Sequence, residues 1–89
     1  MGLSEHTAIN LTSGALLDTR RVCYWKVKEN WFIFIPGCGT GSLKNHEVEE
    51  HEDNTISVTP SIMLKGHYNG TPTECHGYLT HGVWKDCVQ

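Results

Sequence analysis

The sequence lacks the features that mark several large classes of protein. None of its apolar runs approaches the roughly 18 residues that a membrane span needs. Arg20-Arg21 is the only pair of adjacent basic residues, so the clustered lysines and arginines of a nucleic-acid footprint are missing. The stretch from Met1 to His6 has neither the basic nor the apolar region of a signal peptide. We therefore predict a cytoplasmic protein that binds neither nucleic acid directly nor a membrane.

Signs of catalysis are also sparse. The glycine-rich stretch Pro36-Gly-Cys-Gly-Thr-Gly41 is not followed in register by the Gly-Lys-Ser/Thr of a phosphate loop. His76 and Asp86 resemble a base with its orienting carboxylate, but on a two-stranded hairpin such a pair is more often a surface hydrogen bond. We expect a non-enzymatic protein, with a small metal-dependent or thiol enzyme as the alternative.

The chain has 89 residues and a net charge of −3, which indicates one small domain. A domain of this size buries only about 60% of its unfolded surface, so its stability is marginal. Such domains are often stabilised further by disulfides, a metal ion or a partner subunit. Four cysteines and six histidines supply candidates for the first two.

Residues 20–36 have the pattern of a β-hairpin. The segments Arg21–Lys28 and Trp31–Ile35 are rich in β-branched and aromatic residues, and Glu29-Asn30 between them predicts the turn. This turn places Val27 opposite Phe32. One face of the hairpin is then apolar and is predicted to be the core face; its residues are Cys23, Trp25, Val27, Phe32 and Phe34.

Residues 54–73 predict a bent strand followed by a loop. The side chains alternate from Thr55 to Thr59, which points Ile56, Val58 and Ile62 inward. Pro60 cannot donate to a ladder and marks a bulge, an edge or a bend between two strands. Residues 65–73 are expected to form a loop with a tight turn at Asn69-Gly70.

The last stretch, Glu74 to Gln89, predicts a second hairpin. Its turn signal is Thr80-His81-Gly82, in which Gly82 can take the positive φ of a three-residue loop. Opposite residues of antiparallel strands have Cβ atoms about 5 Å apart. The expected register brings three pairs together: Tyr78 with Trp84, His76 with Asp86, and Cys75 with Cys87.

These elements predict an all-β fold of five or six short strands. Two hairpins and a bent strand form a small twisted antiparallel sheet or a partly open barrel. Residues 20–89 make a single β domain. Residues 1–19 form an N-terminal arm or a short helix capped by Ser13, with a pairing strand or a mobile tail as the alternatives.

Three segments in order resemble a family of small uncharacterised proteins of tailed phages and prophages. These segments are Pro36-Gly-Cys-Gly39, Thr59-Pro-Ser-Ile62, and Cys75-His-Gly-Tyr78 followed by Gly82 and Asp86-Cys87. Some members of that family are labelled ammonia monooxygenases, a label that no residue here supports. The resemblance covers roughly residues 31–88 and implies a phage accessory protein.

The cysteines predict a structural zinc site. Cys75 and Cys87 would meet across the last hairpin, and the glycines around Cys38 leave its backbone free to wrap a metal-bound sulfur. Cys23 is the preferred fourth ligand. His46, His67 and His76 are alternatives for that position. Free buried cysteines and a disulfide are the competing interpretations.

The acidic run at residues 43–53 predicts a partner-binding surface. Its pattern is that of a solvated loop or an exposed helical turn. Its carboxylates and nearby exposed aromatic side chains suit a host protein with a basic surface; the residues are Glu47, Glu49, Glu50, Glu52, Asp53, Trp31, Trp84 and Tyr68. A more specific form of this hypothesis is an inhibitor of a host defence complex, such as a CRISPR effector. A virion-associated structural role and a homodimer remain alternatives.

Overall fold

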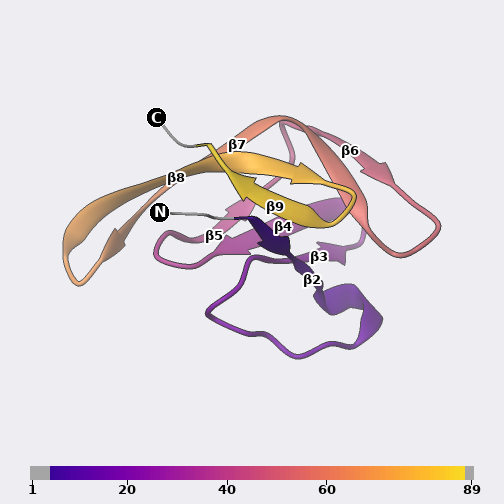
Figure 1. Ribbon diagram of the computed structural model, residues 1–89, viewed down its shortest axis with the longest axis horizontal. Helices are drawn as coiled ribbons and strands as arrows, with labels where there is room; N and C mark the ends of the chain where they lie inside the picture. Colours follow the sequence, from indigo (N-terminus) through magenta and orange to yellow (C-terminus); the bar gives the residue numbers. More distant parts are fainter. Residues whose placement is uncertain (1–4, 88–89) are drawn as a thin grey trace.

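Two β-sheets pack face to face in the computed structural model, which describes residues 5–87 (Figure 1). In chain order the elements are β1 (Glu5–Thr7), β2 (Ile9–Asn10), the 3-10 helix η1 (Leu11–Ser13), β3 (Cys23–Val27), β4 (Asn30–Ile35), β5 (Gly39–Ser42), β6 (Glu47–Glu50), β7 (Ile56–Tyr68), β8 (Thr71–Thr80) and β9 (Val83–Asp86). The larger sheet has the order β1-β9-β8-β7-β6, and the smaller has the order β2-β3-β4-β5. All neighbours are antiparallel except β2 and β3. The predicted all-β fold is confirmed, as an open pair of sheets.

The first hairpin forms in the predicted segment, but its turn lies one residue earlier than predicted and, apart from buried Cys23, its inner face is the opposite one. The turn is Lys28-Glu29, so that Trp25 lies opposite Phe32. The core receives Tyr24, Trp31, Ile33 and Ile35 from these strands. Trp25 and Phe32 instead stack on each other at the half-buried outer face, with ring centroids 6.0 Å apart. Both faces of the hairpin carry large apolar side chains, so alternation alone could not identify the inner one.

The long hairpin of β7 and β8 confirms the predicted turn and corrects the predicted loop. Asn69 and Gly70 both have positive φ, as a two-residue hairpin turn requires. Such a turn lets pairing continue to its edge, and residues 65–73 are therefore mostly strand. The register shifts between Val58 and Ile62, around Pro60, where a bulge or bend was predicted. Ile56, Val58 and Ile62 are buried, as expected.

The N-terminal arm joins both sheets. β1 pairs with β9 in the larger sheet, and β2 pairs with β3 in the smaller one. The helix expected after Ser13 is wrong; the helical turn lies earlier, where Asn10 Oδ1 accepts from the backbone N–H of Thr12 at 2.8 Å. The pairing-strand alternative is correct for β1 and β2, and residues 14–19 are neither helix nor strand.

The last hairpin has a register one residue away from the predicted one. His81 and Gly82 alone form the turn, with φ values of 48° and 75°. Leu79 therefore lies opposite Trp84. A one-residue shift moves a strand's side chains to the other face. Trp84, expected at the surface opposite Tyr78, is 1% exposed and packs between the sheets.

Gly77 provides the space that the Trp84 ring occupies. A Cβ atom at Gly77 would lie 2.5 Å from Trp84 Cζ2 and 2.6 Å from the carbonyl oxygen of Lys85. Both distances are far below van der Waals contact, and one neighbour is backbone that cannot rotate away.

Gly77→Ala should lower the free energy of unfolding by about 1–3 kcal/mol, the usual cost of overpacking a core. Denaturant unfolding measures this change. Thr80→Ala, at an exposed position of the same strand, is the matched control and should change stability by less than about 0.5 kcal/mol. Equal stability of the Gly77→Ala variant and the unsubstituted protein would show that the indole does not lie against Gly77.

Candidate functional site

Cys38 and Cys75 form a disulfide that links the two sheets. Cys38 is buried in the turn between β4 and β5, and its Cα lies 6.4 Å from that of Cys75 on β8. Thr73 holds the same turn, because its hydroxyl donates to the carbonyl oxygen of Gly37 at 2.8 Å. A disulfide was one of the competing interpretations of the cysteines, but the sequence did not point to this pair. The expected meeting of Cys75 with Cys87 is wrong.

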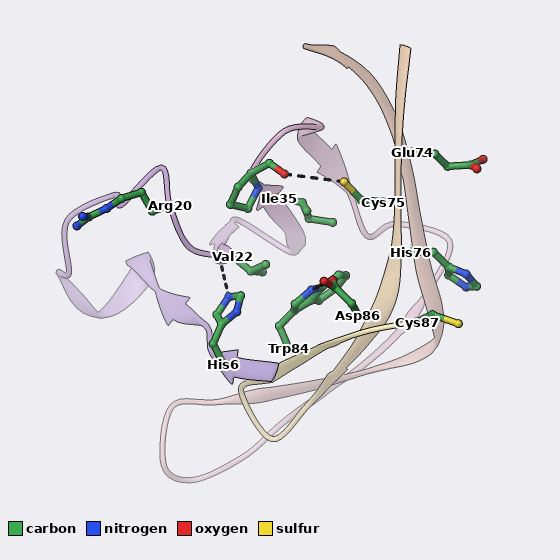
Figure 2. A pocket seen from close by; sticks show the side chains of 11 residues that line it. His6, Arg20, Val22, Ile35, Glu74, Cys75, His76, Trp84, Asp86 and Cys87 are labelled. Atoms are coloured by element: carbon green, nitrogen blue, oxygen red, sulfur yellow. Dashed lines mark hydrogen bonds between the residues drawn. The ribbon is translucent and has the colours of Figure 1, made fainter. Parts of the chain in front are cut away.

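The other two cysteines are separate free thiols. Cys23 is fully buried, and its Sγ donates weakly to the carbonyl oxygens of Asp18 and Arg21 at 3.6 and 3.5 Å. Cys87 is half-buried, and its backbone N–H donates to the carbonyl oxygen of His76 at 2.8 Å. The register places Cys87 on the opposite face of the sheet from Cys75 (Figure 2).

The four predicted zinc ligands therefore do not converge. Within residues 5–87, no group of three or more His, Cys, Asp or Glu side chains could hold a metal ion. The alternative ligands have other surroundings: His46 Nε2 lies 3.2 Å from the carbonyl oxygen of Ser61, His76 bonds the Ser61 hydroxyl, and His67 is exposed. A disulfide offers no thiolate to a metal. Zinc stays a prediction from the sequence, and it would need Cys38 and Cys75 in their reduced state.

A cavity of about 580 Å³ opens between the sheets, beside the disulfide. Figure 2 shows its surroundings, which come from β1, the segment before β3, the end of β4, β8 and β9. The lining residues are His6, Arg20, Val22, Ile35, Pro36, Glu74, Cys75, His76, Trp84, Asp86 and Cys87. In Figure 2, Glu74, His76 and Cys87 point away from the space enclosed by the sheets, and Arg20 extends outward from its loop.

Two polar side chains face the inside of this cavity. Trp84 Nε1 donates to Asp86 Oδ1 at 2.6 Å. His6 Nε2 accepts from the backbone N–H of Val22 at 3.2 Å, which leaves Nδ1 to carry the proton of the neutral ring. Burial and the nearby Arg21 lower the pKa of His6, and Asp86 partly opposes this shift. The expected pairing of Asp86 with His76 is wrong, because the two lie on opposite faces of the hairpin.

The acidic run is an edge strand, and the predicted loop or helical turn is wrong. β6 pairs with β7 on one side only and forms one edge of the larger sheet. Val48 packs against the core, so Glu47 and Glu49 point to the outer face and are exposed, as is Glu52 just beyond the strand. Among the described residues, these three carboxylates make no hydrogen bond or ion pair.

Two other acidic residues of the run are engaged within the molecule. Glu50 Oε2 accepts from Lys26 Nζ at 2.7 Å and from Trp31 Nε1 at 3.1 Å, and these bonds lower the pKa of Glu50. Asp53 Oδ1 accepts from the hydroxyl of Thr55 at 2.6 Å, and this bond lowers the pKa of Asp53. Glu50 therefore connects the edge of the larger sheet to the smaller sheet, and Asp53 fixes the following turn.

The aromatic part of the predicted partner surface needs correction. Trp31 and Trp84 are 8% and 1% exposed, so neither offers a contact surface. Tyr68, at the tip of the long hairpin, is 62% exposed as predicted.

The cavity was missed in the sequence because His6 lies in an arm without periodicity. Asp86 was noticed but assigned the wrong partner, since the His-Gly turn signal fits both a two-residue and a three-residue loop.

Comparisons with protein-family models, curated proteins and solved structures found no match to this chain. Across the described part of the chain, no helix has the length and apolar character to cross a membrane.

Opening the Cys38–Cys75 disulfide should destabilise the fold. The bond joins residues 37 positions apart, and the chain-entropy model gives about 4 kcal/mol for a loop of this size. Denaturant unfolding with and without reductant, and of the Cys38→Ser/Cys75→Ser variant, measures the loss. Cys87→Ser, which removes a free thiol, is the control. Titration of more than two thiols in unreduced, denatured protein would refute the disulfide.

Acidification should weaken the fold through His6. Its pKa in the folded state lies below the ordinary 6.5 of the unfolded chain, so its contribution is fully present above that value. This contribution is lost as pH falls through the folded pKa. Protonation of Nε2 would also remove the acceptor that the Val22 N–H uses. The melting temperature of His6→Gln, followed from about pH 8 to about pH 5, should fall less than that of the unsubstituted protein. Parallel curves would contradict this role.

Proposed function

We propose that this chain is a non-enzymatic protein that binds a basic surface of a partner protein through Glu47, Glu49 and Glu52. The observation that supports this proposal is that some carboxylates of the acidic run bond within the molecule and others do not. Glu50 and Asp53 serve the fold, whereas the three proposed contact residues are exposed and have no intramolecular partner among residues 5–87.

The arrangement of these carboxylates suits recognition of a charged surface. Glu47 and Glu49 project from the same face of an edge strand, about 7 Å apart at the spacing of alternate strand residues. A fixed backbone holds them there, because β6 is paired with β7 along its length. Clustered charges of one sign speed the encounter with a partner of opposite charge and orient it.

The partner that we propose is a host protein, with the chain acting as a phage accessory protein in the host cytoplasm. The ordered Pro-Gly-Cys, Thr-Pro-Ser-Ile, Cys-His-Gly-Tyr and Asp-Cys segments support the phage origin. Nucleic-acid-binding complexes present basic grooves, which makes a host defence complex such as a CRISPR effector the specific candidate. In a reducing cytoplasm Cys38 and Cys75 would tend to be thiols, so location bears directly on the stability of this protein.

A charge reversal of the three free glutamates tests the proposal. Glu47→Lys/Glu49→Lys/Glu52→Lys should reduce partner binding at least about tenfold, because each change converts attraction into repulsion. The melting temperature should change little, since exposed charges usually shift stability by about 0.5 kcal/mol or less. Affinity capture from the bacterial host, with quantitative mass spectrometry, identifies proteins that the unsubstituted chain retains and the variant loses.

The matched control reverses three exposed glutamates elsewhere. Glu5→Lys/Glu29→Lys/Glu74→Lys produces the same net charge from β1, the first hairpin turn and β8. Binding that survives in the control and is lost in the β6 variant supports a local contact surface. Equal losses in both variants would reduce the effect to overall charge, and retention in both would place the contact surface away from β6.

A further inference from the structure

The cavity between the sheets has both apolar and polar lining residues, and the carboxylate of Asp86 lies in its wall and is open to solvent. Val22, Ile35 and Trp84 are buried core residues that line it, and Pro36 and the Cys75 end of the disulfide lie beside them. Its volume of about 580 Å³ lies within the roughly 300–1,000 Å³ of typical small-molecule sites. A ligand here would bury an apolar stem and present a polar end to Asp86 and His6.

We propose that this cavity binds an alkyl cation, an ammonium or guanidinium group on an apolar stem, with Asp86 as its counter-ion. Trp84 Nε1 donates to Asp86 Oδ1 at 2.6 Å, which fixes the carboxylate at the cavity wall. The hydrogen bond occupies one oxygen and orients the group, leaving the second oxygen to accept from a ligand. A carboxylate held in this way binds a charged donor with a shorter and stronger hydrogen bond than a neutral one.

The other charged groups around the cavity do not neutralise Asp86. Arg20 is 88% exposed in its side chain and is paired with Asp18, its Nε 3.2 Å from Asp18 Oδ1. Arg21 donates from Nη2 to the carbonyl oxygen of Thr7 and is not among the lining residues. His6 is neutral at neutral pH, because burial and Arg21 lower its pKa. Glu74 points away from the cavity, and its Oε2 lies 3.8 Å from Lys65 Nζ.

This site is independent of the proposed function. Asp86 lies on β9, next to the β1 edge of the larger sheet, whereas the free glutamates lie on β6 and just beyond it, at the other edge. The cation can come from a free alkylamine or guanidine, or from a lysine or arginine side chain of a peptide. Failure at one site would leave the other unaffected, and the two experiments therefore fail separately.

The test is a nuclear magnetic resonance titration of the intact chain with butylguanidinium. Saturable shifts are expected at the amides of Val22 and Cys75 and at the indole N–H of Trp84. Butylurea has the same stem and a similar planar head without the charge, and it should bind at least tenfold more weakly. Acetyl-Gly-Arg-Gly-amide presents the same guanidinium on a peptide. Tighter binding of this peptide would identify a protein side chain as the source, and weaker binding would identify a free ligand.

Asp86→Asn tests the counter-ion. An asparagine oxygen can still accept from Trp84 Nε1, so the fold should persist while affinity for butylguanidinium drops at least tenfold. Glu47→Gln, which removes an exposed carboxylate from β6, should leave that affinity unchanged. Equal binding of butylguanidinium and butylurea to the unsubstituted chain would overturn the proposal without relying on any variant. Shifts confined to β6, or unchanged affinity in Asp86→Asn, would also overturn it.

Discussion

The burial of Trp84 between the sheets is the contact on which this fold depends. An indole ring is among the largest apolar groups that a small domain can bury. Its position requires a two-residue turn at His81-Gly82, which turns Trp84 inward, and a glycine at position 77, which leaves room for the ring. The same ring forms a wall of the cavity and orients Asp86. Core packing and the proposed cation site therefore rest on one register.

Contacts between the sheets compensate for the small size of the core. The Cys38–Cys75 disulfide connects them at the end beside the cavity, and Glu50 bonds Lys26 and Trp31 at the β6 edge. The N-terminal arm adds one strand to each sheet. A domain of this length has little apolar area to spare, so such cross-links matter more than they would in a larger protein.

Local signals predicted local structure well and failed where packing decides. Alternation identified the inward residues of β7, and Asn69-Gly70 identified a turn, because both depend on residues close in sequence. The predicted register of the last hairpin was wrong by one residue, because Gly82 tolerates positive φ in either loop length. The zinc hypothesis depended on that displaced register. The disulfide joins residues 37 positions apart, and only the packing of the sheets brings them together.

The negative charge on β6 can be explained in two ways, as protection of the exposed edge against pairing with another chain or as recognition of a partner protein. Exposed edge strands commonly carry charged side chains that prevent another chain from pairing with them. Protection requires repulsion of strands in general, and the acidic side chains of β6 would supply it wherever they pointed. Glu50, however, turns inward to bond Lys26, while Glu47 and Glu49 share the outer face and Glu52 continues the charge past the strand. That outer face is not the hydrogen-bonding edge, so the free carboxylates there can protect the edge and still be open to a partner, and the two explanations are compatible.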